Sequence, residues 1–357
     1  MSHAAVSAHN IWKVFGNRSR EAMAAVREQG LSKQQILEQY NCVIGVADVS
    51  FEVQPGQIYC IMGLSGSGKS TLVRHINRLL EPSAGEIFVN QTNVMKIDTK
   101  ALQAFRNKHI AMVFQNFALM PHRSVLDNIA MPLEIRGVNK NERLQIAEHN
   151  LQLVELTGWG NKFAHELSGG MQQRIGLARA LASDPDILLM DEPFSALDPL
   201  IRRQLQSQFM ALSAKMKKTT VFITHDLEEA VRIGDRIAIM RDGRIIQEDT
   251  PENIVLHPAN EYIADFVAGI SRLNIVRAHA LMTPLQEFST QHGTVGEGWQ
   301  RFDESTPLNI LIAAAAQDPQ PLIITKADKA VGVVVYQDLL RAILADESLQ
   351  QEADTRV

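Results

Sequence analysis

The feature that most constrains the fold of this 357-residue chain is the glycine-rich segment GLSGSGKS at residues 63–70. It follows an apolar, β-prone run, Gln57 to Met62, and leads into a helix-forming run, Thr71 to Leu80. Glycines in such a loop let backbone N–H groups converge on phosphate oxygens, and the following helix adds the positive end of its dipole. The order strand, loop, helix predicts a nucleotide site at the edge of a sheet in an α/β fold.

Individual residues of this segment have different expected roles. We expect Lys69 to reach the β and γ phosphates and Ser70 to place its hydroxyl on Mg²⁺, while Thr71 adds a phosphate contact. The expected nucleotide contacts in the segment are Gly63, Ser65, Gly66, Ser67, Gly68, Lys69, Ser70 and Thr71. Kinases, GTPases and motor ATPases share this motif, so it does not by itself select a reaction.

Two further apolar runs, Ile187 to Met190 and Thr220 to Ile223, show no alternation of polar and apolar residues. Strands of parallel sheets have this pattern because helices cover both of their faces. Between these runs and the first strand, Asn141 to Leu156 repeats apolar residues at helical spacing. The sequence therefore predicts a parallel sheet flanked by helices, with an inserted helical region.

Two carboxylates, Asp191 and Glu192, end the second of the predicted strands. Ligands bind at the carboxyl edge of parallel sheets, so both acids are expected beside the phosphate loop. Asp191 suits the metal, directly or through water, and Glu192 suits a general base that polarises the attacking water. Taken alone, the pattern is equally compatible with a strand end that carries two solvated acids.

The segment Leu167 to Gln172, LSGGMQ, precedes a helix-forming run, Gln173 to Ala182. Ser168, Gly169 and Gly170 would present a hydroxyl and free N–H groups at a helix N-terminus, which is a second potential anion site. The chain has two helix N-termini that could bind phosphate, but only one of them carries a lysine-bearing loop. This fits an arrangement in which the helix end at Ser168 binds the nucleotide of a partner copy. A plain helix start is the alternative.

In combination, these segments resemble an ATP-binding-cassette subunit: residues 63–70 match its first nucleotide motif, 187–192 its second and 167–172 its signature. The resemblance implies roles for further residues. Gln115 matches the loop glutamine that touches Mg²⁺ or water, and Asp198, in the segment 195–198, matches the loop that crosses to the other subunit. His225 matches the histidine that contacts the γ phosphate and orients Glu192, and Phe15 the aromatic that stacks on adenine.

The resemblance also implies an architecture and a mechanism. It predicts a cassette over residues 1–270 with a RecA-like parallel core, an antiparallel β subdomain and a helical subdomain at about 116–180. Two copies would face head to tail and hold two ATP molecules, each with Mg²⁺, between the phosphate loop of one copy and the signature of the other. Loss of the γ phosphate would remove the contacts that join the copies.

Three segments are similar to subunits that power uptake of glycine betaine, proline and choline: the insertion at 17–44, the string ALMPH at 118–122, and the string DEPFSALDPLIR at 191–202. The likeness implies an importer at the cytoplasmic face of the bacterial inner membrane, with a transmembrane permease that docks beside Gln115 and an extracytoplasmic substrate-binding protein. The substrate does not touch this chain, so its identity follows from likeness alone.

Three alternatives remain at this point. The importer could carry another amino acid or polar solute. A non-transport cassette ATPase of DNA repair or translation would normally have a coiled-coil insertion or two cassettes, and the sequence has neither. A regulatory module that only senses ATP is disfavoured by the presence of both Glu192 and His225.

The insertion itself is predicted to form two short helices, Glu21 to Gln29 and Lys33 to Tyr40, with a capping box at Ser32 and Gln35. A DNA-reading helix-turn-helix is disfavoured because acidic residues are interspersed with the basic ones. The formal net charge of -5, without a basic stripe, likewise argues against nucleic acid as a partner.

Beyond residue 270 the parallel-sheet pattern stops and a shorter α-β-β-α pattern begins. A helix after Pro307, strands at Leu322 to Thr325 and Val331 to Val335, and a helix at Tyr336 to Leu344 resemble one cystathionine-β-synthase-type (CBS) regulatory module. Such modules usually act in pairs, and only Ala280 to Pro284 suggests a first copy. We therefore expect 271–357 to be an incomplete CBS-like domain or a dimerisation tail.

Targeting and redox features are sparse. The first twenty residues lack the apolar stretch of a secretion signal, and the longest apolar runs, such as Ile310 to Ala316, are far shorter than the roughly 20 residues that cross a bilayer. Cys42 and Cys60 are the only cysteines and lack metal-ligand spacing, which favours a reducing compartment.

Overall fold

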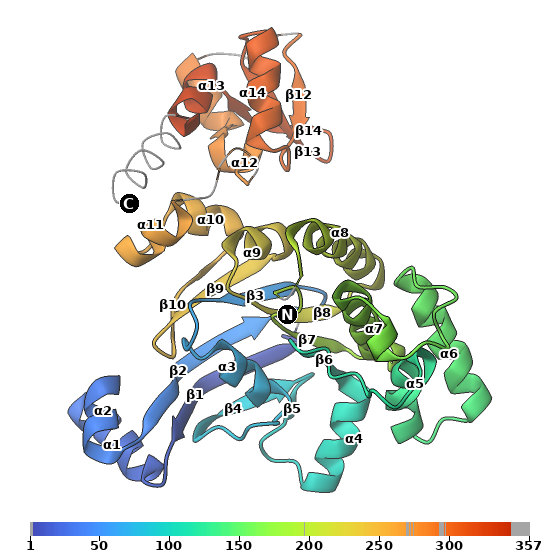
Figure 1. Cartoon of the computed structure of the whole chain (residues 1–357). Coiled ribbons are helices and arrows are strands. Elements are labelled where there is room, and N and C mark those ends of the chain that lie inside the picture. The colour runs from blue at the N-terminus through green and yellow to red at the C-terminus, as the bar shows by residue number, and fades with distance from the viewer. Residues whose placement is uncertain are drawn as a thin grey trace. The chain divides into compact units, whose positions relative to one another are not determined.

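The computed structural model describes residues 3–195, 197–268, 271, 273, 275–292, 296 and 298–343, except for the side chains of 291 and 292 (Figure 1). The chain forms two compact units, Met1–Glu248 and Asp249–Val357, which are described separately below. Within the described residues, no helix has both the length and the apolar composition that crossing a membrane needs.

A six-stranded sheet in the order β10-β9-β3-β8-β7-β6 is the core of the first unit. Neighbouring strands from β9 to β6 run parallel, and β3 and β7 are buried along their whole length. Its strands are β3 (Ile58–Met62), β6 (Ile110–Val113), β7 (Ile187–Asp191), β8 (Thr219–Thr224), β9 (Arg236–Arg241) and β10 (Arg244–Asp249). Met62 pairs with Thr224 and Asp191 with Ile223, so three functional segments leave the sheet at one edge.

A smaller antiparallel sheet lies on the side of helix α3 (Lys69–Ile76) that faces away from the six-stranded sheet. Leu72, Val73 and Ile76 of α3 pack into one apolar core with residues of both sheets, and Figure 1 shows α3 between the two sheets. The strands of this sheet are β1 (Val6–Phe15), β2 (Val43–Val53), β4 (Ala84–Val89) and β5 (Thr92–Asn93). The expected parallel core and antiparallel subdomain are both confirmed.

Helices α1 (Ser19–Gln29) and α2 (Lys33–Tyr40) form the predicted insertion between β1 and β2. The capping box of Ser32 and Gln35 is present. Ala22, Ala25 and Ile36 are buried against β1 and β2, where Trp12 lies in the same cluster. The insertion is thus packed on the sheet by its apolar face rather than projecting freely.

The helical region has its own apolar core, formed by α5 (Val125–Ile135), α6 (Lys140–Leu153) and α7 (Gly169–Ala182). Figure 1 shows these three helices side by side at one end of the six-stranded sheet. The remaining helices of the unit are α4 (Thr99–His109), the 3₁₀ turn η1 (Ala164–Glu166), α8 (Pro199–Met216) and α9 (Leu227–Ile233).

Two helices end earlier than the sequence suggests. We expected helices to Leu80 and Leu156, but α3 ends at Ile76 and α6 at Leu153. Arg78 has φ 52° and Glu155 has φ 60°, and such left-handed residues stop a right-handed helix.

The second unit contains a four-stranded sheet in the order β11-β14-β13-β12. One apolar cluster joins this sheet to its helices and includes Leu308, Leu311, Ile324 and Val334. The unit comprises α10 (Pro251–Leu256), α11 (Glu261–Val267), α12 (Ala278–Leu281), β11 (Thr283–Pro284), α13 (Leu285–His292), β12 (Arg301–Asp303), α14 (Leu308–Gln317), β13 (Leu322–Lys326) and β14 (Lys329–Val334). Residues 336–343 are helical.

The compact units divide at 248/249, whereas the sequence placed the boundary at 270. Leu256 packs against the core of the second unit and Glu252 pairs with Arg277 at 3.3 Å, so α10 belongs to that unit. Residue 270 and residues 344–357 lie outside the described part of the chain. The CBS-like character of this unit stays a prediction.

Candidate functional site

The phosphate loop is shaped by close backbone approaches that only glycine permits. A Cβ on Gly63 would lie 2.2 Å from the carbonyl oxygen of Met240, and one on Gly68 would lie 2.2 Å from that of Gly45. Both glycines also have left-handed backbones, with φ 151° and 104°. Ser65 and Gly66 form the exposed tip of the loop. The segment therefore has one preferred shape, which Gly45 and Met240 support from outside.

Lys69 is buried beneath this loop and donates to the carbonyls of Gly63 and Leu64 at 2.7 and 3.0 Å. Burial lowers the pKa of its ammonium, and the carboxylates of Glu192 and Asp191 oppose that shift. Ser67 Oγ is buried and has no hydrogen-bond partner among the described residues. A buried cation and an unpaired hydroxyl beside a ring of backbone N–H groups suit a phosphate.

The metal-site candidates Ser70 and Asp191 lie in contact. Ser70 Oγ donates to Asp191 Oδ1 at 2.7 Å, while Arg74 Nη2 lies 3.3 Å from Asp191 Oδ2. Mg²⁺ takes oxygen ligands and usually combines one or two protein groups with phosphate and water. No cluster of three His, Cys, Asp or Glu side chains able to hold a metal occurs in the described residues. The donor set therefore fits a phosphate-bound Mg²⁺.

Glu192 is the point where three predicted residues meet. Its Oε2 lies 3.2 Å from His225 Nδ1 and accepts from Gln115 Nε2 at 3.3 Å. Its backbone is left-handed, with φ 47°, and its N–H donates to Ile223 O at 3.1 Å. Ser195 Oγ donates to Glu192 O at 3.0 Å, which fixes the turn. The carboxylate is thus held by two side chains, Gln115 and His225, that come from two separate loops.

Phe15 lies at the other end of the phosphate loop. A Cβ on Gly45 would be 2.7 Å from Phe15 Cε2 and 3.6 Å from the methyl group of Thr71. The ring therefore rests on Gly45 beside α3, and it remains 39% exposed. Lys13 Nζ lies 5.1 Å from the ring centroid. The exposed part of this ring could stack on an adenine base.

The signature residues and Asp198 are at two other helix starts. Ser168 caps α7 and accepts from Met171 N at 3.4 Å, with Gly169 and Gly170 opening the helix. Asp198 caps α8 and accepts from Leu200 N and Ile201 N at 3.2 and 3.1 Å. Ala196, between Ser195 and Leu197, lies outside the described residues. The hydrogen bonds of Ser168 stay within α7, and α7 lies with α5 and α6 rather than beside α3 (Figure 1).

Sequence reasoning missed two arginines that hold functional loops. Buried Arg179 of α7 donates to Phe117 O and Ala118 O at 2.7 and 2.6 Å, and thereby fixes the loop that follows Gln115. Arg202 of α8 contacts Asp226 and two carbonyls, as described below. Arg202 follows Asp198 by four residues, a helical spacing that places both on one face and could have drawn attention to it.

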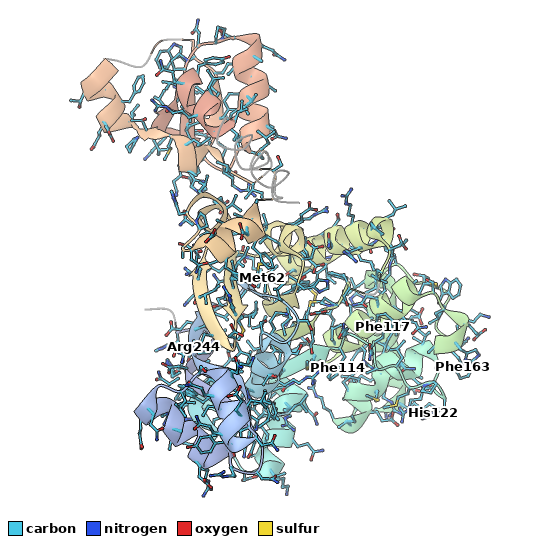
Figure 2. All side chains as sticks on the ribbon, turned by 60° about the vertical axis from the view of Figure 1, so that its left-hand side comes forward. Met62, Phe114, Phe117, His122, Phe163 and Arg244 are labelled. Atoms are coloured by element: carbon cyan, nitrogen blue, oxygen red, sulfur yellow. The ribbon has the colours of Figure 1, made fainter. Side chains whose placement is uncertain are left out.

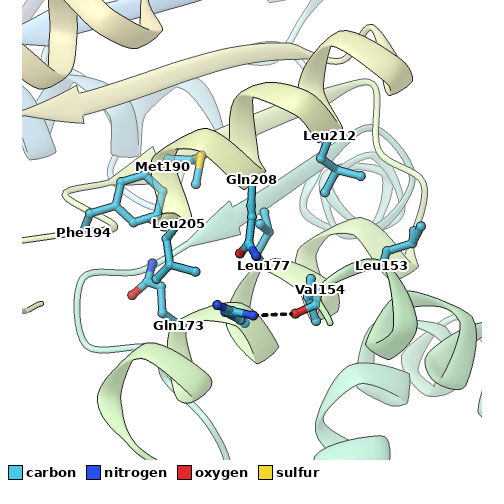
Figure 3. A pocket seen from close by; sticks show the side chains of 10 residues that line it. Leu153, Val154, Gln173, Leu177, Met190, Phe194, Leu205, Gln208 and Leu212 are labelled. Atoms are coloured by element: carbon cyan, nitrogen blue, oxygen red, sulfur yellow. Dashed lines mark hydrogen bonds between the residues drawn. The ribbon is translucent and has the colours of Figure 1, made fainter. Parts of the chain in front are cut away.

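Two hollows adjoin this machinery. A cleft is lined by residues of β6, of the loop that follows it and of α4, α5 and α7, among them Phe114, Met120 and Arg179. Figure 2 shows Phe114 and Phe117 beside the helical region. A second, smaller pocket lies between α6, α7, α8 and β7 (Figure 3). Its lining includes Gln173, whose buried amide has no hydrogen-bond partner among the described residues.

Comparison with known proteins adds independent findings. Residues 46–195 match the family model described as ABC transporter. The chain is 51% identical over 360 residues to the glycine betaine/proline betaine transport ATP-binding protein ProV of Salmonella typhimurium, covering 97% of this chain and 86% of that one. It is 50% identical over 277 residues to the glycine betaine/carnitine transport ATP-binding protein GbuA of Listeria monocytogenes, covering 78% and 70%.

A solved structure shares the fold. The ATP-binding cassette MJ0796, in a dimeric post-hydrolysis state bound to ADP and Pi, superposes with a TM-score of 0.58 at 30% identity and covers 69% of this chain and 98% of its own. The cassette motifs found in the sequence therefore occur in a chain that has the fold of an ATP-binding cassette and that matches the ABC transporter family model. The chain belongs to the ABC transporter family, as one of its ATP-binding subunits.

Proposed function

We propose that this chain binds and hydrolyses ATP to power a membrane importer of a quaternary amine osmolyte. The observation that carries the proposal is the position of Glu192, whose carboxylate contacts His225 and Gln115 and lies at the same sheet edge as Lys69 and Ser70. A carboxylate held by a histidine and an amide beside a phosphate loop is equipped to accept a proton from water.

Each residue of the site has one task in this proposal. The backbone of residues 63–68 cradles the phosphates, and Lys69 exchanges the carbonyls of Gly63 and Leu64 for the β and γ phosphates. Phe15 stacks on the adenine. Glu192 takes the proton of the attacking water, while His225 contacts the γ phosphate and orients Glu192. Thr71 adds a phosphate contact.

We propose Ser70, Asp191 and Gln115 as the residues that would hold Mg²⁺, directly or through water. The metal supplies charge neutralisation at the phosphate oxygens during transfer. Arg74, which lies 3.3 Å from Asp191 Oδ2, would hold that carboxylate in its orientation.

Two copies form the working unit in this proposal. Ser168, Gly169, Gly170 and Asp198 stand on α7 and α8, where their hydrogen bonds stay within their own helices. They would therefore serve the nucleotide held by the phosphate loop of the second copy. Hydrolysis separates the copies because the γ phosphate contributes contacts to both.

The cleft beside Phe114 and Arg179 is our candidate for the contact with a transmembrane permease at the cytoplasmic face of the inner membrane. It adjoins the loop of Gln115, so a helix inserted there would communicate with Glu192. An extracytoplasmic binding protein would deliver the solute. The solute class rests on relatives named for glycine betaine, proline betaine, carnitine and trimethylamine N-oxide transport. For the second unit we propose a regulatory or dimerisation role.

Replacement of Glu192 by glutamine tests the hydrolytic site. We expect Glu192→Gln to bind ATP, to run as a dimer in size-exclusion chromatography with ATP and Mg²⁺, and to release phosphate at least about 100-fold more slowly. Glu228→Gln is the matched control, since it removes one exposed carboxylate from the nearby α9. Equal phosphate release by Glu192→Gln and the unaltered chain would refute the assignment.

Transport itself needs a cellular assay. In cells whose own uptake systems are deleted, this chain with its permease and binding protein should accumulate labelled glycine betaine, and the Glu192→Gln chain should not. Uptake of other polar solutes, with glycine betaine excluded, would favour an importer of a different specificity. ATP hydrolysis without any co-purifying membrane protein would favour a cassette ATPase outside transport.

A further inference from the structure

Arg202 lies one turn into α8 and makes three polar contacts at once. Its Nη2 donates to Leu197 O at 3.2 Å and to Ser195 O at 3.5 Å, and its Nη1 lies 3.3 Å from Asp226 Oδ2. The guanidinium side chain is 26% exposed and that of Asp226 is 32% exposed. A planar group with five donors can serve two carbonyls and a carboxylate together, whereas an ammonium is a single compact charge.

Two of the contact partners of Arg202, Ser195 and Asp226, are each connected to Glu192. On one side, Ser195 donates through its Oγ to Glu192 O and accepts from Gln115 Nε2 at 3.5 Å. On the other, Asp226 directly follows His225, whose Nδ1 lies 3.2 Å from the Glu192 carboxylate. Arg202 therefore links the loop after Glu192 to the segment that carries His225, through side-chain and main-chain contacts on both sides of the general base.

A second contact, made by two other side chains, joins the same two helices. Gln206, one turn further along α8, donates to Glu229 Oε1 of α9 at 2.8 Å, and both side chains are buried. Burial raises the pKa of Glu229, which identifies this contact as an interior one. Because Gln206 and Glu229 hold α8 against α9, loss of Arg202 should release the loop of Ser195 and Leu197 from Asp226 while α8 stays packed on α9.

We infer that Arg202 is a positioning residue that couples the loop carrying Ser195, Leu197 and Asp198 to His225, so that contact of this loop with a second copy sets the position of Glu192. The inference rests on the proposed hydrolysis at Glu192. The contacts of Arg202 go to Leu197, Ser195 and Asp226 rather than to the phosphate loop, so we expect it to act on the chemical step and to leave nucleotide affinity unchanged.

A merely structural ion pair makes a different prediction. Partly exposed pairs contribute about 0 to 1 kcal/mol to stability, and losing one would lower activity only as far as it unfolds the chain. A positioning residue instead lowers kcat at constant KM, because the interaction counts only in the transition state.

The test compares steady-state ATP hydrolysis by full-length variants. We expect Arg202→Ala to lower kcat about tenfold while KM for ATP changes less than about twofold. Arg202→Lys should recover part of kcat, since a cation can still pair with Asp226. Arg203→Ala is the matched control: it removes an exposed arginine from the next position of α8 and should hydrolyse ATP like the unaltered chain.

A double-mutant cycle identifies the coupling. Asp226 also caps α9 by accepting from Glu229 N at 3.1 Å, and asparagine caps equally well, so Asp226→Asn removes charge while keeping the helix start. The pair Arg202→Ala and Asp226→Asn should lose no more kcat than the stronger single variant. Additive losses, an unchanged kcat in Arg202→Ala, or an equal loss in Arg203→Ala would overturn the inference. An unaltered chain without ATPase activity would instead reject the proposed function.

Discussion

The backbone of Glu192 occupies the left-handed region, which costs a non-glycine residue of order 1 kcal/mol or more. Two hydrogen bonds hold it there: its N–H reaches Ile223 O in β8, and Ser195 Oγ reaches its carbonyl. The resulting turn sends the carboxylate toward His225 and Gln115 instead of along the strand. At the scale of single residues, the general base is positioned by its backbone as much as by its side-chain partners.

His75 provides a test of how the buried end of α3 responds to pH. It is fully buried, with Nδ1 2.6 Å from Leu80 O, and burial lowers its pKa from 6.5 to about 4. Between those values the unfolded chain binds a proton that the folded chain excludes, so stability falls as the pH falls. The contribution lost between pH 7 and pH 4 is about 3 kcal/mol.

The variant His75→Asn keeps a donor for Leu80 O but cannot be protonated. Urea unfolding of this variant should therefore show a smaller loss of unfolding free energy between pH 7 and pH 4 than the unaltered chain. His149→Asn is the control, because His149 is exposed and its removal should leave the full pH dependence. Identical pH profiles for the two variants would show that His75 is not the responsible group.

Single residues were predictable where a motif named them, and less so elsewhere. Lys69, Ser70, Asp191 and Glu192 stand where a strand end and a phosphate loop require them, since the register of a parallel sheet brings those ends to one edge. Two of the three contacts of Arg202 are with carbonyls, which carry no sequence signal. Carbonyl contacts depend on loop shape, and loop shape here depends on left-handed residues that the sequence does not mark.

At the scale of elements, the type of each helix and strand was easier to predict than its end. Amphipathic spacing gave α6, and uninterrupted apolar runs gave β7 and β8. The ends of α3 and α6 were missed because Arg78 and Glu155 adopt left-handed conformations without being glycine or asparagine. The capping box of α2 was found because it has both a sequence signature and a local cause.

The junction of β2 with the phosphate loop gives a prediction for an element contact. Gly45 supports both the Phe15 ring and Gly68, and a Cβ on it would lie 2.7 Å from Phe15 Cε2. Gly45→Ala should displace the ring, and because stacking of a base on an aromatic contributes about 1–3 kcal/mol, KM for ATP should rise about tenfold. The value of kcat should change much less, since Glu192 and its partners do not touch this strand.

The matched control for this change is Gly176→Ala in α7. Its Cβ would meet no atom closer than Phe117 O at 3.9 Å, which is ordinary contact. It therefore introduces the same methyl group without a clash. Isothermal titration with ATP on both variants measures the difference directly, and equal affinities would show that Phe15 does not support the base through Gly45.

At the scale of the whole molecule, the sequence predicts the architecture of the first compact unit in more detail than that of the second. The first unit follows from its motifs, because the phosphate loop demands a strand and a helix and the family supplies the rest of the order. The second unit has a short-range pattern only, and it begins at Asp249, before residue 270, where the sequence pattern changes.

The most specific consequence of the proposed two-copy mechanism is that two inactive chains should restore one another. Lys69→Ala disables the phosphate loop of its own copy, and Gly169→Asp places a negative charge at the signature. A Cβ on Gly169 has no neighbour nearer than Leu197 Cδ2 at 3.9 Å, and aspartate is favourable at a helix start, so this variant should fold. In the mixed dimer, the intact loop of one chain faces the intact signature of the other.

Each variant alone should be nearly inactive, while an equal mixture should recover about a quarter of the ATPase activity of the unaltered chain if the two sites act independently, since half of the dimers are mixed and each has one complete site. The measurement is phosphate release before and after mixing at constant total protein. A mixture of Lys69→Ala with the doubly altered chain is the control, because it contains no complete site. Activity of the first mixture no higher than that of the control would mean that Ser168 and Gly169 do not act on the nucleotide of the opposite copy.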